Sequence, residues 1–95
     1  MEENPDERIL QLIRDKHSVE DGFLLLVKTY QQRLYWHIRV MLADHDDTDD
    51  VLQETFIKIW KGIRNFREES KLFTWLYRIA SNEALSFLRK RDKER

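Results

Sequence analysis

Turn-forming residues are scarce in this chain, and their scarcity restricts its fold more than any other feature. Only two glycines and one proline occur among 95 residues. An all-β domain needs a turn roughly every 8–12 residues, and glycine and proline supply most of those turns. Apolar residues instead recur at spacings of three and four, the period of an amphipathic helix. The sequence therefore predicts one all-α domain over residues 1–95, a compact bundle of four helices.

Capping signals divide the chain into those four helices. Residues with side-chain oxygens that can cap a helix precede each apolar run, and acidic residues follow in most first turns. The caps that we expect are Asn4 before Pro5, Ser18, Asp47 or Thr48, and Ser70. The helices that they predict run over about Pro5–Asp15, Val19–Leu42, Thr48–Ile63 and Lys71–Asp92. Residues 64–69 have no helical period and predict an ordered loop.

Apolar stripes on these helices predict the core. The expected core positions are Ile9, Leu10 and Ile13, then Phe23, Val27, Tyr30, Leu34, Ile38 and Met41, then Leu52, Phe56, Ile59 and Ile63. On the last helix the inward side is expected to hold Leu72, Leu76, Ile79, Ala80, Glu83 and Phe87.

Several classes of protein are disfavoured by composition. The chain has no cysteine, so it can form neither a disulfide nor a thiolate zinc site. It has no apolar run of about 18 residues and no signal peptide, so we expect a cytoplasmic protein that contacts no membrane. The histidines lack metal-ligand spacing and no glycine-rich phosphate loop is present, so we expect no enzyme activity, metal or cofactor. His37 lies beside the core stripe and is expected to be packed.

Charge is distributed very unevenly along the sequence. Residues 1–57 contain 6 Lys and Arg against 13 Asp and Glu, whereas residues 58–95 contain 11 against 5. Such polarity indicates two surfaces that bind two different partners. A solvated surface of mixed charge on a helical bundle is the plainer alternative.

The third predicted helix has polar residues and one isoleucine on the side away from its core stripe. At 100° per residue, Asp50, Gln53, Glu54 and Ile57 share that side. An isoleucine among acceptor-rich side chains favours a protein contact, although a single exposed apolar residue needs no explanation.

The fourth predicted helix has a cationic row on one face. Lys71, Arg78, Asn82 and Arg89 are separated by 7, 4 and 7 residues, which places them within about 40° of one another. Cations neutralise phosphates, asparagine can pair with a base edge, and Trp75 at the edge of the row offers a stacking surface. This pattern favours nucleic-acid binding, and an ordinary solvated face with Trp75 tucked into the bundle stays the alternative.

The loop before this helix adds further donors beside a helix N-terminus. Arg64, Asn65, Arg67 and Ser70 could hold a phosphate or an extruded base. Phe66 is expected mainly to anchor the loop in the core.

Three consecutive segments resemble region 2 of bacterial RNA polymerase sigma factors. Residues 50–60, DVLQETFIKIW, resemble the family pattern D-L-x-Q-E-x-F-x-x-x-W. Residues 66–80 contain TWLYRIA, and residues 82–90 are similar to the promoter-recognition segment that follows. The match is nearly continuous from residue 49 to residue 91, and its compact form resembles the extracytoplasmic-function type.

The resemblance implies two binding faces. The family's second segment docks on the coiled coil of the polymerase β′ clamp, which implies a polymerase-binding role for Asp49, Asp50, Gln53, Glu54 and Ile57. The following segments melt the −10 promoter element, trap a base of the non-template strand and read the sequence. They imply DNA contacts by Arg64, Asn65, Phe66, Arg67, Ser70, Lys71, Trp75, Tyr77, Arg78, Asn82, Ser86, Arg89 and Lys90. Asn82 is the expected base reader, and Arg89 and Lys90 are expected to hold phosphates.

The chain departs from the family pattern at three positions. Ser86 stands where Asp is frequent, Glu68 replaces a common Gly, and Phe73 replaces a polar residue. These departures bear on which promoter is read more than on the role itself. The family normally has a second helical domain that reads the −35 element. We expect this sequence to be a shortened form whose residues 89–95 begin the linker to it.

Two other classes of function stay open. One is a protein-interaction bundle whose partner is an anti-sigma protein and whose DNA face is idle. The other is a helix-turn-helix repressor, for which the loop over residues 64–69 is too long.

Overall fold

Helices account for nearly all of the chain in the computed structural model, which describes residues 4–94. In that range the structure contains α1 (Pro5–Arg14), α2 (Val19–Leu42), α3 (His45–Gly62), the short 3-10 helix η1 (Ile63–Asn65) and α4 (Leu72–Lys93). The predicted all-α bundle of four helices is therefore confirmed. No helix within these residues is long and apolar enough to cross a membrane.

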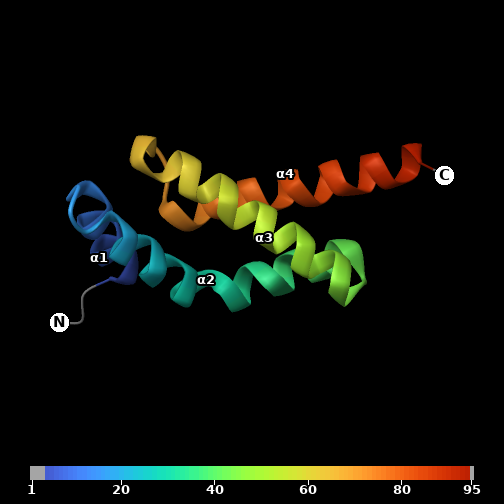
Figure 1. Ribbon diagram of the computed structural model, residues 1–95, viewed down its shortest axis with the longest axis horizontal. Coiled ribbons are helices and arrows are strands. Elements are labelled where there is room, and N and C mark those ends of the chain that lie inside the picture. The colour runs from blue at the N-terminus through green and yellow to red at the C-terminus, as the bar shows by residue number, and fades with distance from the viewer. Residues whose placement is uncertain (1–3, 95) are drawn as a thin grey trace.

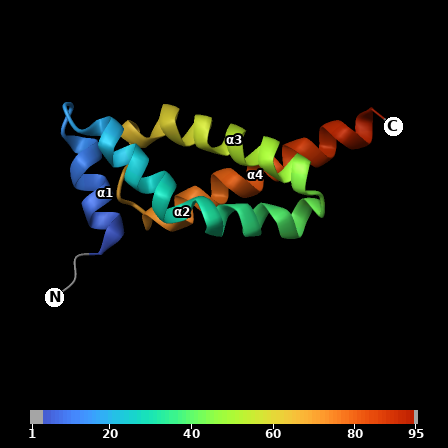
Figure 2. The same ribbon diagram turned by 60° about the horizontal axis from the view of Figure 1, so that its bottom comes forward.

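The three long helices lie side by side and α1 packs across one end of them (Figures 1 and 2). α3 runs antiparallel to α2, and α4 turns back antiparallel to α3 (Figure 1). The last turns of α4 project beyond the turn between α2 and α3, which gives the molecule extents of 49 × 25 × 22 Å. The faces of α3 and α4 that look away from α2 are thereby left without a helical neighbour (Figure 2).

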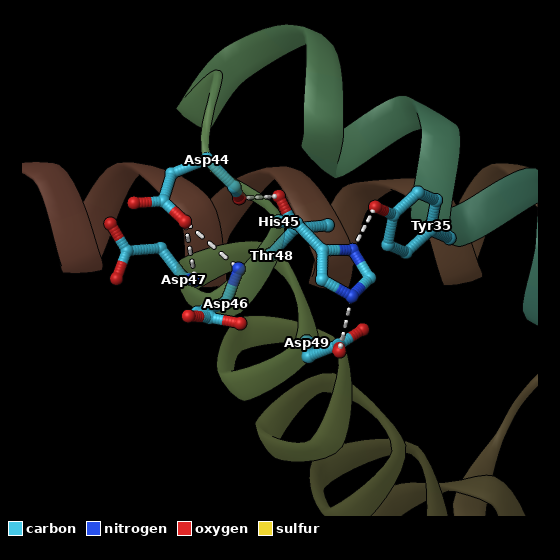
Figure 3. A network of polar contacts seen from close by, with 7 residues as sticks. All are labelled: Tyr35, Asp44, His45, Asp46, Asp47, Thr48 and Asp49. Atoms are coloured by element: carbon cyan, nitrogen blue, oxygen red, sulfur yellow. Dashed lines mark hydrogen bonds and ion pairs between the residues drawn. The ribbon is translucent and has the colours of Figure 1, made fainter.

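The structure confirms the predicted bounds of α2. The predicted start of α3 at Thr48 is wrong. α3 begins three residues early because Asp44, and neither Asp47 nor Thr48, is its N-cap. The Asp44 carboxylate accepts hydrogen bonds from the backbone N–H groups of Asp46 at 2.8 Å and Asp47 at 3.4 Å (Figure 3). Ala43 supplies the tight turn with a left-handed φ of 61°, so the whole α2–α3 connection needs only two residues.

The start of α4 also differs from the prediction. Lys71, and not Ser70, occupies the N-cap position, with an extended backbone and no side-chain cap. α1 ends at Arg14, one residue before the predicted end.

The core follows rows of residues that, apart from one step of three in α3, are spaced four apart. The buried residues of α2 are Gly22, Leu26, Tyr30, Leu34, Ile38 and Leu42; those of α3 are Thr48, Val51, Thr55 and Ile59; those of α4 are Leu72, Leu76, Ala80 and Ala84. Rows with this spacing are the ridges used in the commonest class of helix packing. The predicted stripes mixed spacings of three and four, so Leu10, Phe23, Val27, Met41, Leu52, Phe56, Ile79, Glu83 and Phe87 are half-buried margins.

The hydroxyl groups of Thr48, Thr55 and Tyr30 have hydrogen-bond partners, whereas Arg91 Nε on α4 is buried without one. The Thr55 hydroxyl donates to the Val51 carbonyl oxygen at 2.7 Å, and the Thr48 hydroxyl donates to that of Asp44 at 2.6 Å. The Tyr30 hydroxyl donates to Asp6 Oδ1 at 2.6 Å and so fastens α1 to α2. Burial, and then this hydrogen bond, raises the pKa of Tyr30 well above its usual range.

Candidate nucleic-acid interface

The predicted cationic row on α4 is exposed along the helix. Lys71, Arg78, Asn82 and Arg89 are all exposed; the last three share one face of the continuous helix α4, and Lys71 precedes that helix as its N-cap. The buried row of α4 lies on another side of the helix, so none of these groups takes part in the core. The polar ends of Arg78, Asn82 and Arg89 are therefore free to meet a ligand.

A cleft opens between the loop and the beginning of α4. Its volume is about 450 Å³, and its lining residues are Gly62, Asn65, Phe66, Arg67, Glu69, Ser70, Trp75 and Arg78. Six of these were predicted as DNA contacts, and the fold brings them together from η1, the loop and α4. A hollow with amide, hydroxyl and guanidinium groups around aromatic rings suits an unstacked base.

The aromatic wall of this cleft is held in place by packing. The rings of Phe66 and Trp75 lie 5.1 Å apart between centroids, and both are half-buried against the core. Gly62 lies beneath the indole, where an added Cβ would be 3.2 Å from Trp75 Cζ2. Phe66 anchors the loop as expected, and Trp75 is partly tucked into the bundle with its remaining surface on the cleft.

Two cleft residues were missed by the sequence reasoning. The sequence predicts Glu69 only as part of the loop over residues 64–69, and it predicts Gly62 only as part of the end of the third helix. A glycine thirteen residues before a tryptophan gives no periodic signal, so the close approach of their elements is a property of the fold alone.

The structure separates three predicted DNA contacts from the cleft. The Arg64 guanidinium lies over the Trp60 ring at 5.2 Å and faces a different hollow, which Arg14 and Lys16 also line. Tyr77 turns toward α2, where its ring lies 5.0 Å from that of His37. Lys71 borders the hollow between α1, α2 and α4.

His37 is packed between helices, as predicted. Its Nε2 and the Ser81 hydroxyl oxygen are 2.7 Å apart, and the resulting hydrogen bond joins α2 to α4. Nowhere in residues 4–94 do three or more histidines, cysteines or carboxylates gather as metal ligands.

The remaining two predicted DNA contacts line a smaller cleft between α3 and α4. Ser86 and Lys90 share this hollow of about 250 Å³ with Asp50 and Glu54 of α3. The end of the cationic row therefore borders the acidic face of the neighbouring helix.

The outer face of α3 is exposed at four of the five predicted polymerase contacts. Asp50, Gln53 and Glu54 are exposed, and Ile57 keeps 45% of its surface open to solvent. An isoleucine exposed to this extent among carboxylates and an amide is a surface suited to a protein partner.

The fifth residue, Asp49, is half-buried on the side of α3 that faces α2. Its carboxylate lies 3.3 Å from His45 Nε2, and the other ring nitrogen of His45 forms a 2.6 Å hydrogen bond with the Tyr35 hydroxyl (Figure 3). Asp49 thus pairs within α3 with His45, which in turn contacts Tyr35 of α2, and it does not share the exposed side of the other four.

An ion pair joins α3 to α4 between the two faces. Lys58 donates to the Glu83 carboxylate, whose side chain is only 13% exposed. The hydrogen bond to Glu83, and then the charge of that carboxylate, raises the pKa of Lys58.

Comparisons with known proteins identify one family. The sigma-70 region 2 family matches residues 26–94. The ECF RNA polymerase sigma-E factor of Haemophilus influenzae is 40% identical over 75 residues, which are 79% of this chain and 39% of that protein. The RNA polymerase sigma-H factor of Pseudomonas aeruginosa is 43% identical over 67 residues, 70% of this chain and 35% of that protein.

A solved structure extends the likeness to the whole fold. The NMR structure of an engineered region 2 of sigmaE in complex with GTAAAA has a TM-score of 0.84 and 30% identity, and the match covers 99% of this chain and 97% of that chain. The present chain spans about two fifths of the length of the curated relatives named above. Sequence and fold agree, and the chain belongs to the sigma-70 region 2 family, in its extracytoplasmic-function type.

Proposed function

We propose that this chain is the part of a sigma factor that docks on RNA polymerase and recognises and melts the −10 promoter element. The observation that carries the proposal is a pair of exposed rows of different chemistry on adjacent helices, which border each other at the hollow lined by Asp50, Glu54, Ser86 and Lys90. α3 has the acidic row with Ile57, and α4 has the cationic row with Asn82. Support also comes from the engineered sigmaE region 2, which was solved in complex with GTAAAA.

On the DNA face, we assign phosphate contacts to Arg78, Arg89 and Lys90 and base reading to Asn82. The cleft that Trp75 walls would receive one extruded base of the non-template strand. Capture of that base offsets the few kcal/mol that unstacking costs, so binding energy alone drives melting and no enzyme chemistry is needed.

On the other face, the partner that we propose is the coiled coil of the β′ clamp. Gln53 and Glu54 would accept hydrogen bonds or pair with cations there, and Ile57 would pack against an apolar side chain. An anti-sigma protein in the same cytoplasmic compartment would inhibit this chain by covering either face.

The direct test is binding to short single-stranded DNA. We expect the chain to bind the hexamer GTAAAA more tightly than the permuted hexamer AAGATA. Contact with three or four phosphates predicts a slope of roughly −2 to −3 when log affinity is plotted against log salt. Fluorescence anisotropy with both hexamers at several salt concentrations gives both quantities. Preference for duplex DNA would favour a helix-turn-helix repressor, and no binding to any DNA would favour a pure protein-interaction bundle.

The clamp face is tested by a double substitution. Gln53→Ala with Ile57→Ala should weaken binding to an isolated β′ clamp coiled coil about fivefold, or about 1 kcal/mol, because both side chains are exposed at the proposed contact. Affinity for GTAAAA should not change. The matched control is Gln11→Ala with Val40→Ala, an exposed amide and an exposed apolar residue elsewhere. Equal clamp affinity in the two double variants would remove the assignment.

A further inference from the structure

Glu83 is an acid in an unexpected place, directly after Asn82 in a cationic helix. Its carboxylate is 13% exposed, whereas the side chain of its partner Lys58 is 56% exposed. A carboxylate that is largely out of water needs a charged or hydrogen-bonding partner, and Lys58 is the one that the structure gives it.

The position of Glu83 determines what its charge can affect. One residue along a helix is a rotation of 100°, so Glu83 turns toward α3 while Asn82 stays on the exposed row. The carboxylate nevertheless belongs to the residue next to Asn82, and Glu83 lines the same hollow as Lys90. Without a counter-charge it would repel phosphates that approach this row, and it would be free to draw Lys90, which lines the same hollow, away from them.

We propose that Lys58 is a positioning residue for the DNA-binding face: it neutralises Glu83 and holds the turn of α4 on which Asn82 stands. Lys58 belongs to α3, the helix of the proposed clamp contact, so the ion pair crosses between the two faces. This inference rests on the proposed binding of single-stranded −10 DNA. It differs from a direct role, in which Lys58 would contact a phosphate or Glu83 would accept a hydrogen bond from a cytosine amino group.

A double-mutant cycle separates these roles. The variants are Lys58→Met, which keeps the aliphatic stem, Glu83→Gln, which keeps the shape of the acid, and the two together. Dissociation constants are measured for GTAAAA by fluorescence anisotropy at low salt, and thermal unfolding of each variant checks that the bundle is intact.

The expected pattern is non-additive. Lys58→Met should weaken binding about fivefold, because it leaves the Glu83 carboxylate unpaired. At the effective dielectric constant of a protein surface, repulsion between one such charge and the DNA phosphates is of this order. Glu83→Gln should bind as well as the unaltered chain or up to about twofold better, and the double variant should bind like Glu83→Gln alone. The conservative Lys58→Arg should keep the affinity, since it keeps the positive charge.

Each other pattern overturns the inference. If Lys58→Met costs the same in the Glu83→Gln background, Lys58 acts on DNA directly. If Glu83→Gln alone weakens binding, the carboxylate takes part in recognition. If the unaltered chain binds GTAAAA but the changes are additive, only this inference fails, whereas an unaltered chain that binds no hexamer overturns the proposed function as well.

Discussion

Asn82→Ala is expected to reduce the preference for GTAAAA over AAGATA by roughly 1–3 kcal/mol, a factor of about 5 to 150. Asn82 is the one residue of the exposed α4 row that can both donate and accept toward a base edge, because the other three members are cations. A carboxamide pairs in two places with adenine, and AAGATA replaces the adenines at the third and fifth positions of GTAAAA by G and T. The phosphate contacts would survive the substitution, so affinity for AAGATA should hardly change.

The control for Asn82 is a neighbour in the same row with a different expected effect. Arg89→Ala should weaken both hexamers equally and make the salt slope shallower by about 0.7, the value for one phosphate contact on a single strand. Titrations of both hexamers with both variants, at matched salt, provide the comparison. An equal loss for the two hexamers in Asn82→Ala would show that Asn82 does not read bases.

The helices could be predicted from the sequence because their signals are local. The predicted bounds of α2 match the structure, although the Ser18 side chain makes no capping hydrogen bond, and the other helices were located to within three residues. The start of α3 was missed because a run of polar residues, Asp44 to Asp47, contains several candidate caps. Only the folded backbone shows that Asp44 receives the two N–H groups. Which row is buried also depends on the neighbouring helix, so the ridges spaced by four residues could not be read from α2 alone.

The candidate site likewise has a part that could be predicted from the sequence and a part that could not. Exposure of Asn82 and Arg78 on one side, and of Gln53 and Ile57 on another, follows from helix geometry and could be predicted. The directions of Arg64 and Tyr77 could not, because their partners come from other elements. Trp60 takes the Arg64 guanidinium, and His37, 40 residues away in the sequence, takes the Tyr77 ring.

Gly22→Ala is expected to destabilise the domain by roughly 2 kcal/mol, although helix propensity predicts a gain. Replacing glycine by alanine within a helix normally adds up to about 1 kcal/mol of stability. In the fold, however, a Cβ at Gly22 would lie 2.9 Å from the backbone nitrogen of Ile13 and 2.9 Å from Leu12 Cβ. A backbone atom can give way only if α1 moves, so the cost should reach the upper end of the usual overpacking range, about 3 kcal/mol.

The second glycine of the chain provides the matched comparison. A Cβ at Gly62 would meet only the side chain of Trp75, at 3.2 Å, and a ring can shift where a backbone cannot. Gly62→Ala should therefore lie within about 1 kcal/mol of the unaltered chain, with the gain in propensity offsetting the shift of the indole. Urea unfolding of both variants measures the difference. Equal stability of the two would mean that α1 does not press on α2 at Gly22.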